Sequence, residues 1–294
     1  MEIINLDEGV INALNTFTKK PIKKIDKFCT FKKPLVIGSG NAFHVGKILF
    51  EGTNAVFADE SDYLKKLKDI DGSVIISSFG GKHAPKIAKK LKEKGIKIVL
   101  LTNNPNAIAK KYADKTYIFP ENPEPYTYNI STYLSMIFSK TGENPTKILK
   151  FIQENSKKIP KDLKKYDAFY IIIPEKFYLA SNMLLTKFEE LFGSKISARV
   201  FTFEHTKHAE TIVSSNTELF ISLGQKNNIF GKNRLNLSLP KDLNYAGFIA
   251  YSYYLIGQIQ KQNKPYFKQN IKEYIKKASK MFGQKINLIV SSKK

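Results

Sequence analysis

The sequence predicts an α/β protein with two domains, each built around a mainly parallel sheet. Two observations support this prediction. Short apolar runs of strand length alternate with helix-length stretches, at a spacing typical of parallel strands joined by helical crossovers. The alternation stops once, at the TGENP loop of residues 141–145, and then begins again. Because 294 residues are enough for two domains, we expect the domain boundary at this loop.

The first part of the chain is expected to contain a helical segment and one α/β domain. Residues 1–33 form the helical segment, in which apolar residues up to Phe17 could share a helix face before Pro21 interrupts it. Residues 34–145 form the first domain. Its strands are expected at 35–38, 55–57, 74–78, 96–102 and 116–119. Its helices are expected at 42–50, 62–68, 85–94, 107–112 and 128–140.

Residues 146–294 form the second predicted domain, which ends in two helices. Its strands are expected at 168–173, 199–204, 218–224 and 235–239. Its helices are expected at 146–156, 177–192, 244–262 and 266–281. A last apolar run at 286–290 has no evident place in this arrangement.

The charge of the chain is strongly positive. Lysine and arginine number 48 against 26 acidic residues, and the formal net charge is +22. Only Arg199 and Arg234 are arginines, whereas proteins that read nucleic acids rely on arginine for bidentate contacts. The lysines are scattered in pairs. We therefore expect a solvated basic surface and no nucleic-acid partner, with attraction of a small phosphorylated anion as the alternative.

The cysteine content and the apolar runs narrow the class of protein further. The single cysteine, Cys29, cannot form an intramolecular disulfide, and no Cys/His cluster indicates a metal. We therefore expect neither a metal nor an organic cofactor. The N-terminus lacks the pattern of a secretory signal, and the longest apolar runs are too short to cross a membrane. These features predict a soluble cytoplasmic protein with no membrane partner.

A glycine turn at residues 38–41 follows the first strand and precedes a helix. Glycines there let the backbone approach a ligand, and free amides at the helix start attract an anion, so Gly40 and Asn41 are candidate binding residues. The acidic residues 59–60 after the second strand also fit a dinucleotide-binding motif. Phe43 at the third glycine position argues against that motif, and tight packing is the other alternative.

A second turn, at residues 77–83, follows the third strand, and again a helix comes next. Because the carboxyl ends of neighbouring parallel strands lie at one sheet edge, both turns should face one crevice. A dinucleotide gives no reason for the second turn, whereas a compact phosphate ester such as a sugar phosphate uses both. The candidate binding residues of this turn are Ser78, Gly80, Gly81, Lys82 and His83. Lys82 and His83 can also be interpreted as a solvated helix start.

Several segments resemble the sugar isomerase (SIS) domain family. The pattern Ser78-x-Gly80-Gly81-x-His83 resembles the phosphate loop of the family, Ser-x-Ser-Gly-x-Thr, and residues 38–47 resemble its Gly-Thr-Ser-x-x-Ala turn. The most specific match is the run at 96–119, which is similar to the family's Thr-Asn strand end, the following helix and the Ala-Asp before its last strand.

The second half of the chain resembles a second SIS domain. Lys187-x-x-Glu190 matches a Lys-x-x-Glu motif of the family, and His205 matches its histidine after a short strand. The resemblance thus covers nearly the whole chain after residue 30. It implies two SIS-type three-layer α/β/α domains, as in the isomerase half of glucosamine-6-phosphate synthase and in archaeal phosphoglucose/phosphomannose isomerases. It also implies a homodimer, in which some relatives take the histidine from the neighbouring subunit.

The resemblance implies aldose–ketose isomerisation of a hexose 6-phosphate or an amino-sugar phosphate. A proton then moves between C1 and C2 through an enediolate, which needs a carboxylate base. The reaction also needs a group that opens the sugar ring and a positive charge near the developing oxyanion. The residues that match these three roles are Glu190, His205 and Lys187, in that order.

The chain departs from the family pattern in ways that bear on these roles. Gly80, His83 and Ala42 stand where the family has hydroxyl side chains that hold phosphate, and Lys82, His83 and Asn41 are the candidate substitutes. The spacing from the predicted base to the histidine is about one residue short, so Glu189 is a second candidate for the carboxylate.

Other interpretations of these residues and other functions stay open. Glu189–Glu190 beside Lys187 also fits a solvated helix face with an ion pair. His205 and His208 also fit a surface pair, or two ligands of a metal site whose other ligands are not evident. A non-catalytic sugar-phosphate sensor is favoured by the missing loop hydroxyls. A glucosamine-6-phosphate deaminase would use the same base and acid but release ammonia, and a dinucleotide-dependent enzyme is a third alternative.

Overall fold

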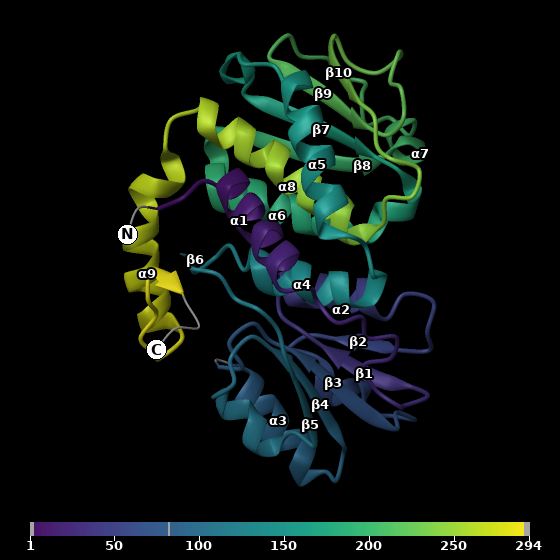
Figure 1. Cartoon of the computed structure of the whole chain (residues 1–294), viewed down its shortest axis with the longest axis vertical. Helices are drawn as coiled ribbons and strands as arrows, with labels where there is room; N and C mark the ends of the chain where they lie inside the picture. The colour runs from purple at the N-terminus through teal and green to yellow at the C-terminus, as the bar shows by residue number, and fades with distance from the viewer. Residues whose placement is uncertain (1–2, 82, 291–294) are drawn as a thin grey trace. The chain divides into compact units, whose positions relative to one another are not determined.

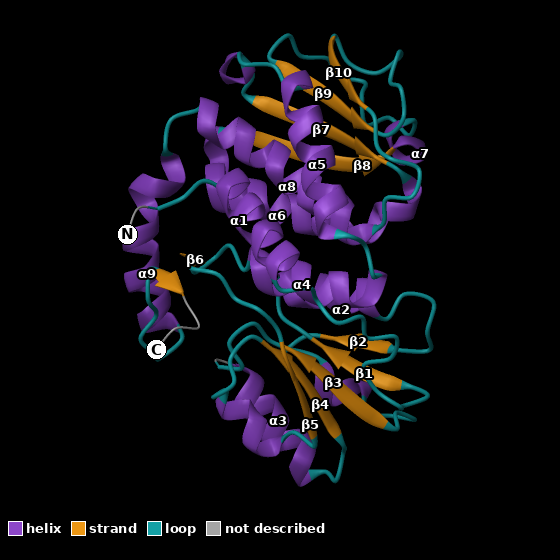
Figure 2. Cartoon of the chain, in the orientation of Figure 1, coloured by secondary structure: helices purple, strands orange, loops and turns teal. Residues whose placement is uncertain are grey.

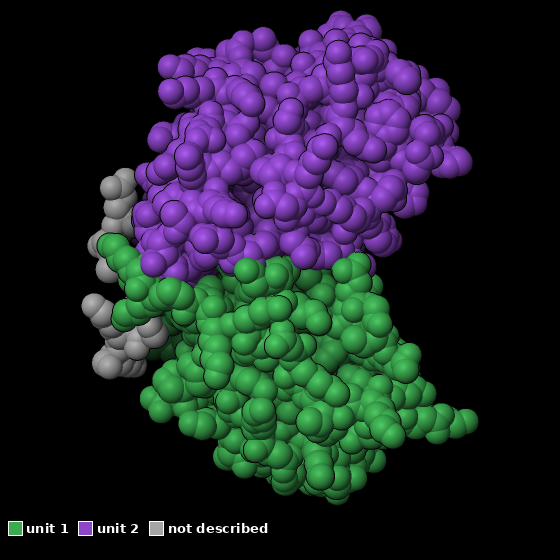
Figure 3. Space-filling view, turned by 45° about the vertical axis from the view of Figure 1, so that its right-hand side comes forward, with its two compact units in different colours: residues 1, 19–142, 273–294 green, residues 2–18, 143–272 purple. Residues whose placement is uncertain are grey.

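The computed structural model describes residues 3–81 and 83–290, which form two compact units (Figure 3). Of the described residues, unit 1 comprises 19–142 and 273–290, and unit 2 comprises 3–18 and 143–272. The change of unit at residue 143 falls in the loop where we expected a domain boundary. The two ends of the chain differ from the linear division expected above, because the N-terminal helix belongs to unit 2 and the C-terminal segment to unit 1.

Unit 1 is built around a five-stranded parallel sheet with the order β2-β1-β3-β4-β5 (Figure 1). Its strands are β1 (Pro34–Ile37), β2 (Val56–Ala58), β3 (Gly72–Ile76), β4 (Ile98–Thr102) and β5 (Lys115–Ile118). Each overlaps a predicted strand. The three central strands are buried along their whole length, which explains why they read as continuous apolar runs. The strand order reverses between β1 and β3, so the two glycine turns follow neighbouring strands.

Helices cover both faces of this sheet (Figure 2). On one face, α3 (His83–Glu93) buries residues such as Ile87 and Leu91 in a core that includes Ile75 of β3. On the other face lies α2 (Asn41–Leu49), since a side chain at Gly46 would collide with Val36 of β1. The remaining elements are η1 (Tyr63–Lys66), η2 (Ile108–Tyr112) and α4 (Ile130–Thr141), which packs against α2. The helices expected at 62–68 and 107–112 are thus 3₁₀ turns.

The C-terminal segment returns to unit 1 as a short strand. The strand β11 (Ile289–Val290) pairs antiparallel with β6 (Glu124–Pro125), and the amide of Tyr126 donates a hydrogen bond to the carbonyl of Leu288 (3.0 Å). The apolar run at 286–290, which had no place in the predicted arrangement, is therefore an addition to the first unit.

Unit 2 is built around a four-stranded parallel sheet with the order β10-β9-β7-β8. Its strands are β7 (Ala168–Ile173), β8 (Ser197–Thr202), β9 (Glu218–Leu223) and β10 (Asn233–Leu237). The strand predicted at 199–204 extends too far at its C-terminal end, because Thr202 caps the short helix α7 (Phe203–Thr206) and ends β8. This places His205 in a helical turn directly after the strand.

The helices of unit 2 follow from local signals in the sequence. Asn144 accepts hydrogen bonds from the amides of Thr146 and Lys147, and Pro145 takes the first position of α5. The helices are α1 (Leu6–Lys19), α5 (Pro145–Asn155), α6 (Ser181–Phe192), α8 (Tyr245–Gln262) and α9 (Tyr266–Met281), the last of which contains the boundary to unit 1. Shorter turns are η3 (Ser156–Lys158), η4 (Leu163–Lys165), η5 (Glu175–Ala180) and η6 (Gly193–Lys195).

The two faces of the unit 2 sheet differ in the side chains that pack on them. The ring of Phe169 on β7 contacts Phe188 of α6, so α6 covers the face to which Phe169 points. Tyr170, the next residue, points to the opposite face and stacks on Phe220 of β9.

Among the described residues, no helix is long and apolar enough to span a membrane.

Candidate functional site

The first glycine turn of unit 1 has an open backbone position and a buried polar side chain. Gly40 has φ +55° with open space where a side chain would lie, and it precedes Asn41, the first residue of α2. Asn41 is 8% exposed, and its Oδ1 atom has no hydrogen-bond partner in the described part of the chain. Ser39 donates a hydrogen bond to Glu60 (2.5 Å), so this turn is tied to the end of β2.

Ser78 is the one hydroxyl of the family's phosphate-loop pattern that the second turn retains, and it forms hydrogen bonds within the protein. It is 6% exposed and donates a hydrogen bond to Asn129 Oδ1 (2.5 Å). It also accepts one from Asn103 Nδ2 (3.3 Å). A hydroxyl has a single proton, so Ser78 can donate to a bound anion only if it leaves Asn129.

The backbone of the second turn presents amides that the protein does not use. Within the described residues, the amides of Phe79, Gly80 and Gly81 donate no hydrogen bond. Gly80 has φ +59°, and α3 begins two residues after Gly81. Consecutive free amides before a helix form a concave site for an anion. The turn therefore offers an anion main-chain donors in place of the missing side-chain hydroxyls.

The two basic candidates of this turn have different outcomes. The ring of His83 lies edge-on to Phe282, with 6.1 Å between the ring centroids, and this apolar contact gives no support for an anion-binding role. Lys82 lies outside the described residues.

A pocket of about 270 Å³ opens beside the second turn. One wall is formed by Phe79, Gly81 and Asn104, and the other by C-terminal residues that include Gln284 and Lys285. Tyr126, which stacks on Phe79 with 5.6 Å between centroids, also lines it. The C-terminal segment was not expected in this site, because nothing local in the run at 286–290 indicates its partner strand.

Two further polar residues, Asn103 and Glu121, extend the site at the ends of β4 and β5. Asn103 Nδ2 lies 3.0 Å from Glu121 Oε1 and 2.8 Å from Thr132 Oγ1. Burial raises the pKa of Glu121 to about 7, and the hydrogen bond from Asn103 opposes this rise. Neither residue was expected in the site from the sequence, although polar residues directly after strands are a usable signal.

In unit 2, the structure brings Lys187 and Glu190 together. Lys187 Nζ lies 2.6 Å from Glu190 Oε2, one turn apart on α6. The Lys187 side chain is 1% exposed, whereas that of Glu190 is 23% exposed. Burial raises the pKa of Glu190, and the charge and hydrogen bond of Lys187 oppose this rise. A buried lysine distinguishes this pair from a solvated helix face, and Glu189 next to it is exposed.

His205 is exposed and lies in α7. Its Nδ1 atom is 3.2 Å from Thr202 Oγ1, and its ring centroid is 6.0 Å from that of Tyr178. His208 is also exposed. No group of three or more His, Cys, Asp or Glu side chains that could hold a metal occurs in the part of the chain that the structure describes.

The topology of unit 2 separates Glu190 from His205. The helix α6 leads from the carboxyl end of β7 to the amino end of β8, and Glu190 lies in its last turn. The Phe188–Phe169 contact also places this end of α6 beside the start of β7. His205 instead follows the carboxyl end of β8, a six-residue strand that spans roughly 20 Å. The two residues of one chain therefore lie near opposite ends of the sheet.

The comparisons with known proteins rest on structure alone. No protein-family model matches the chain, and no curated protein matches its sequence significantly. Glucosamine-6-phosphate deaminase from Thermotoga maritima is 16% identical, with a TM-score of 0.65 over 87% of this chain and 92% of that chain. Tagatose-6-phosphate ketose/aldose isomerase from Escherichia coli is 13% identical, with a TM-score of 0.58 over 89% of each chain.

A third solved structure is the C-terminal domain of glucosamine-fructose-6-phosphate aminotransferase from Francisella tularensis. It is 11% identical, with a TM-score of 0.57 over 87% of this chain and 93% of that domain. At such identities the likeness concerns the fold. The prediction of an α/β fold with parallel sheets flanked by helices, as in SIS-type proteins, is confirmed.

Proposed function

We propose that this chain is a double SIS-domain protein that binds a phosphorylated sugar and interconverts its aldose and ketose forms. The observation that carries the proposal is the Lys187–Glu190 pair, whose lysine is buried and whose carboxyl has a raised pKa. It occurs in a fold shared with solved sugar-phosphate isomerases and a deaminase. A hexose 6-phosphate or an amino-sugar phosphate is the proposed substrate.

The phosphate group is assigned to the second turn of unit 1. Its free amides at Phe79, Gly80 and Gly81 can donate to phosphate oxygens, and the adjoining pocket is lined by Lys285. Ser78 adds a hydroxyl donor when it turns from Asn129 to the ligand. This set replaces the side-chain hydroxyls that the family pattern has and this chain lacks.

In the proposed reaction, Glu190 is the base. Its carboxylate takes the proton from C2 of the open-chain aldose, which leaves an enediolate. A hydroxyl proton passes from O2 to O1, and the carboxyl returns its proton to C1 to give the ketose. A raised pKa suits this role, because the same carboxyl must both accept and release the proton. Lys187 holds the carboxylate in place and supplies positive charge, and His205 assists ring opening.

The proposed active form is a homodimer. Because Glu190 and His205 of one chain lie near opposite ends of the unit 2 sheet, one sugar can use both only if a second copy contributes one of them. No organic cofactor, metal or nucleic acid takes part in this proposal.

A thermal-shift panel followed by a turnover assay tests the proposal. A ligand at a hundredfold excess over its dissociation constant stabilises a protein by about 2.7 kcal/mol. We expect a shift with at least one of fructose, glucose, mannose or glucosamine 6-phosphate and none with NAD. Glu190→Gln should then lower kcat by about 10²–10⁴-fold with little change in affinity, whereas Glu189→Gln should keep activity. The absence of a shift with every sugar phosphate would contradict the proposal.

Deamination of glucosamine 6-phosphate is the second candidate function. The specific observation in its favour is the TM-score of 0.65 with the Thermotoga maritima deaminase. Release of ammonia from glucosamine 6-phosphate, measured alongside ketose formation, separates the two reactions. Binding of a sugar phosphate without either product would instead indicate a non-catalytic sensor.

A further inference from the structure

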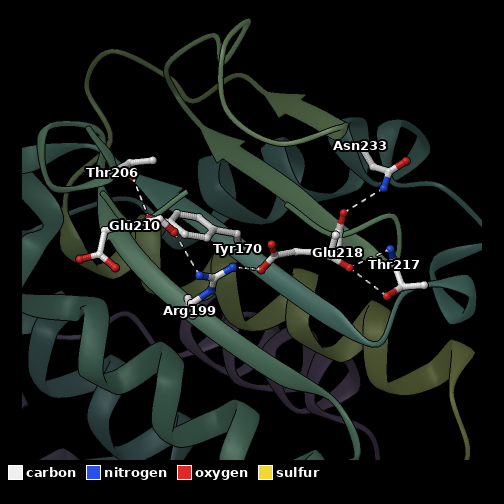
Figure 4. Close-up of polar contacts among 8 residues, drawn as sticks. Tyr170, Arg199, Thr206, Glu210, Thr217, Glu218 and Asn233 are labelled. Carbon is white, nitrogen blue, oxygen red and sulfur yellow. Dashed lines mark hydrogen bonds and ion pairs between the residues drawn. The ribbon is translucent and has the colours of Figure 1, made fainter. Parts of the chain in front are cut away.

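The loop that carries His205 is anchored to the unit 2 sheet at two points (Figure 4). Tyr170, which is fully buried, donates a hydrogen bond from its hydroxyl to Thr206 Oγ1 (3.2 Å). Arg199 of β8 donates one from Nη1 to the carbonyl oxygen of Glu210 (3.1 Å). The backbone is thereby held directly after His205 and again four residues later.

Arg199 is itself held in place from two sides (Figure 4). Its guanidinium forms an ion pair with Glu218, whose side chain is 4% exposed, and lies 4.8 Å from the ring centre of Tyr170. Tyr170 in turn stacks on Phe220, with 4.5 Å between centroids and 9° between planes. These contacts make the base of the His205 loop a packed, ordered platform.

Thr202, at the end of β8, contacts His205 twice. Its Oγ1 atom accepts a hydrogen bond from the backbone amide of His205 (3.3 Å) and lies 3.2 Å from Nδ1 of the His205 ring. The Thr202 carbonyl also accepts a hydrogen bond from Thr206 Oγ1 (2.8 Å), which closes the turn. Thr202 is 1% exposed, so its hydroxyl is largely shielded from water.

The single hydroxyl proton of Thr202 decides the protonation of the ring. If Nδ1 carried a hydrogen, Oγ1 would accept two hydrogen bonds and its own proton would have no acceptor among the described residues. A buried donor without a partner is unfavourable. If Thr202 donates to Nδ1, every group is satisfied. We infer that Thr202 fixes the neutral His205 ring with Nδ1 unprotonated and Nε2 carrying the hydrogen, which makes Thr202 a positioning residue for His205.

The consequence for chemistry rests on the proposed function. With Nδ1 occupied by Thr202, His205 meets a substrate through Nε2–H and acts as a hydrogen-bond donor. Such a donor stabilises the negative charge that develops on the sugar ring oxygen as the ring opens. A neutral imidazole with this arrangement cannot act as a base through Nε2, because that nitrogen already carries a hydrogen. The role of His205 is therefore that of a hydrogen-bond donor.

Long-range ¹H–¹⁵N NMR of the imidazole rings tests the inference without any substrate. The chain has 4 histidines, and the signals of His205 are those that disappear in His205→Asn. At about pH 8, where imidazole is neutral, we expect the unprotonated type of nitrogen signal for Nδ1 and the protonated type for Nε2. Thr202→Val should give the averaged signals of a mixture of tautomers, and Thr202→Ser should restore the single form.

Thr206→Val is the matched control, since it removes another buried hydroxyl of the same turn that does not touch the His205 ring. It should leave the tautomer unchanged. A protonated Nδ1 in the wild-type protein, or an unchanged tautomer in Thr202→Val, would overturn the inference. With an active enzyme, Thr202→Val should also lower kcat by about tenfold at constant KM, and Thr202→Ser should recover it. An inactive wild-type protein would instead refute the proposed function and leave the NMR result standing.

Discussion

Lys187 and Glu190 are an ion pair of unequal exposure: 2.6 Å separates Nζ from Oε2, yet the lysine side chain is 1% exposed and the glutamate side chain 23%. Burial raises the pKa of the Glu190 carboxyl, and Lys187 is the main group that opposes the rise. Removal of the lysine charge in Lys187→Met should therefore raise the pKa of Glu190 further. Difference NMR titration of wild type against Glu190→Gln, each with and without the Lys187 substitution, measures this change.

The Lys207–Glu204 pair is a matched control for this prediction. It has the same spacing along the chain and a distance of 2.7 Å, but its side chains are 49% and 62% exposed. Lys207→Met should leave the titration of Glu190 unchanged, because the exposed Lys207 pairs with Glu204 and is not among the groups that shift the pKa of Glu190. If the enzyme is active, the acid limb of its pH–rate profile should move to higher pH in Lys187→Met only. An unmoved Glu190 titration in Lys187→Met would show that the lysine does not control the carboxyl.

Glu121 should make the stability of unit 1 depend on pH. Its pKa in the folded protein is about 7, against a usual value of 4.5. Between these values the folded state holds a proton that the unfolded chain has released. The free energy of unfolding should therefore fall as the pH rises from about 4.5 to about 7, and stay lower above that range. The loss should be about 1–2 kcal/mol after allowance for the partial exposure of the side chain.

Glu121→Gln tests this pH dependence, because a glutamine oxygen can still accept the hydrogen bond from Asn103. Urea unfolding at about pH 5 and about pH 8 should show the variant gaining stability relative to wild type only at the higher pH. Glu154→Gln, at a side chain that is 60% exposed, serves as the control and should leave the pH dependence as it is. If the free energies of unfolding of wild type and Glu121→Gln changed equally with pH, the pKa of Glu121 would be near its usual value and the prediction would be wrong.

The Ser78–Asn129 hydrogen bond should compete with anion binding. Asn129 has φ +48°, a conformation that glycine adopts without strain, so Asn129→Gly frees the Ser78 hydroxyl while keeping the backbone. We expect inorganic phosphate to bind Asn129→Gly a few-fold more tightly than wild type, measured by calorimetry. Ser78→Ala should bind it more weakly and be about 1 kcal/mol less stable. Equal weakening in both variants would show that the pair only holds the turn together.

The sequence predicts the strands of this protein well, because a buried parallel strand is visible in a short stretch of chain. The buried runs of β4 and β7 and the turns after β1 and β3 depend only on neighbouring residues. The Lys187–Glu190 pair is equally local, since residues three apart on a helix lie side by side.

The rest of the site depends on residues far apart in the chain, which no local pattern reveals. Asn129 reaches Ser78 across 51 residues. The C-terminal segment joins β6 across more than 160 residues and brings Lys285 to the pocket of the second turn. Glu121 stands in a proline-rich connection, and its raised pKa depends on the packing around it. The end of β8 was misjudged for a related reason, because Thr202 continues an apolar run but its side chain caps a helix.

Gly80 should contribute to the stability of the folded protein, apart from any part in binding. Its φ of +59° is unfavourable for residues with a side chain, and a Cβ atom there would lie 2.3 Å from Cβ of Ala107. Gly80→Ala should therefore lower the free energy of unfolding by about 3 kcal/mol or more. Gly95→Ala is the matched control, with φ +71° and open space around the added methyl group, and should lose only about 1 kcal/mol.

A double variant separates the two causes of the expected stability loss in Gly80→Ala, which are the steric contact with Ala107 and the backbone strain of a positive φ. Ala107→Gly removes the methyl group that the new side chain would meet, so Gly80→Ala should cost only about 1 kcal/mol in that background, like Gly95→Ala. Urea unfolding of the four proteins of this cycle measures the coupling directly. A coupling near zero would mean that the turn moves to admit the methyl group. The free amides of Phe79, Gly80 and Gly81 would then not be held in the arrangement from which the phosphate site is proposed.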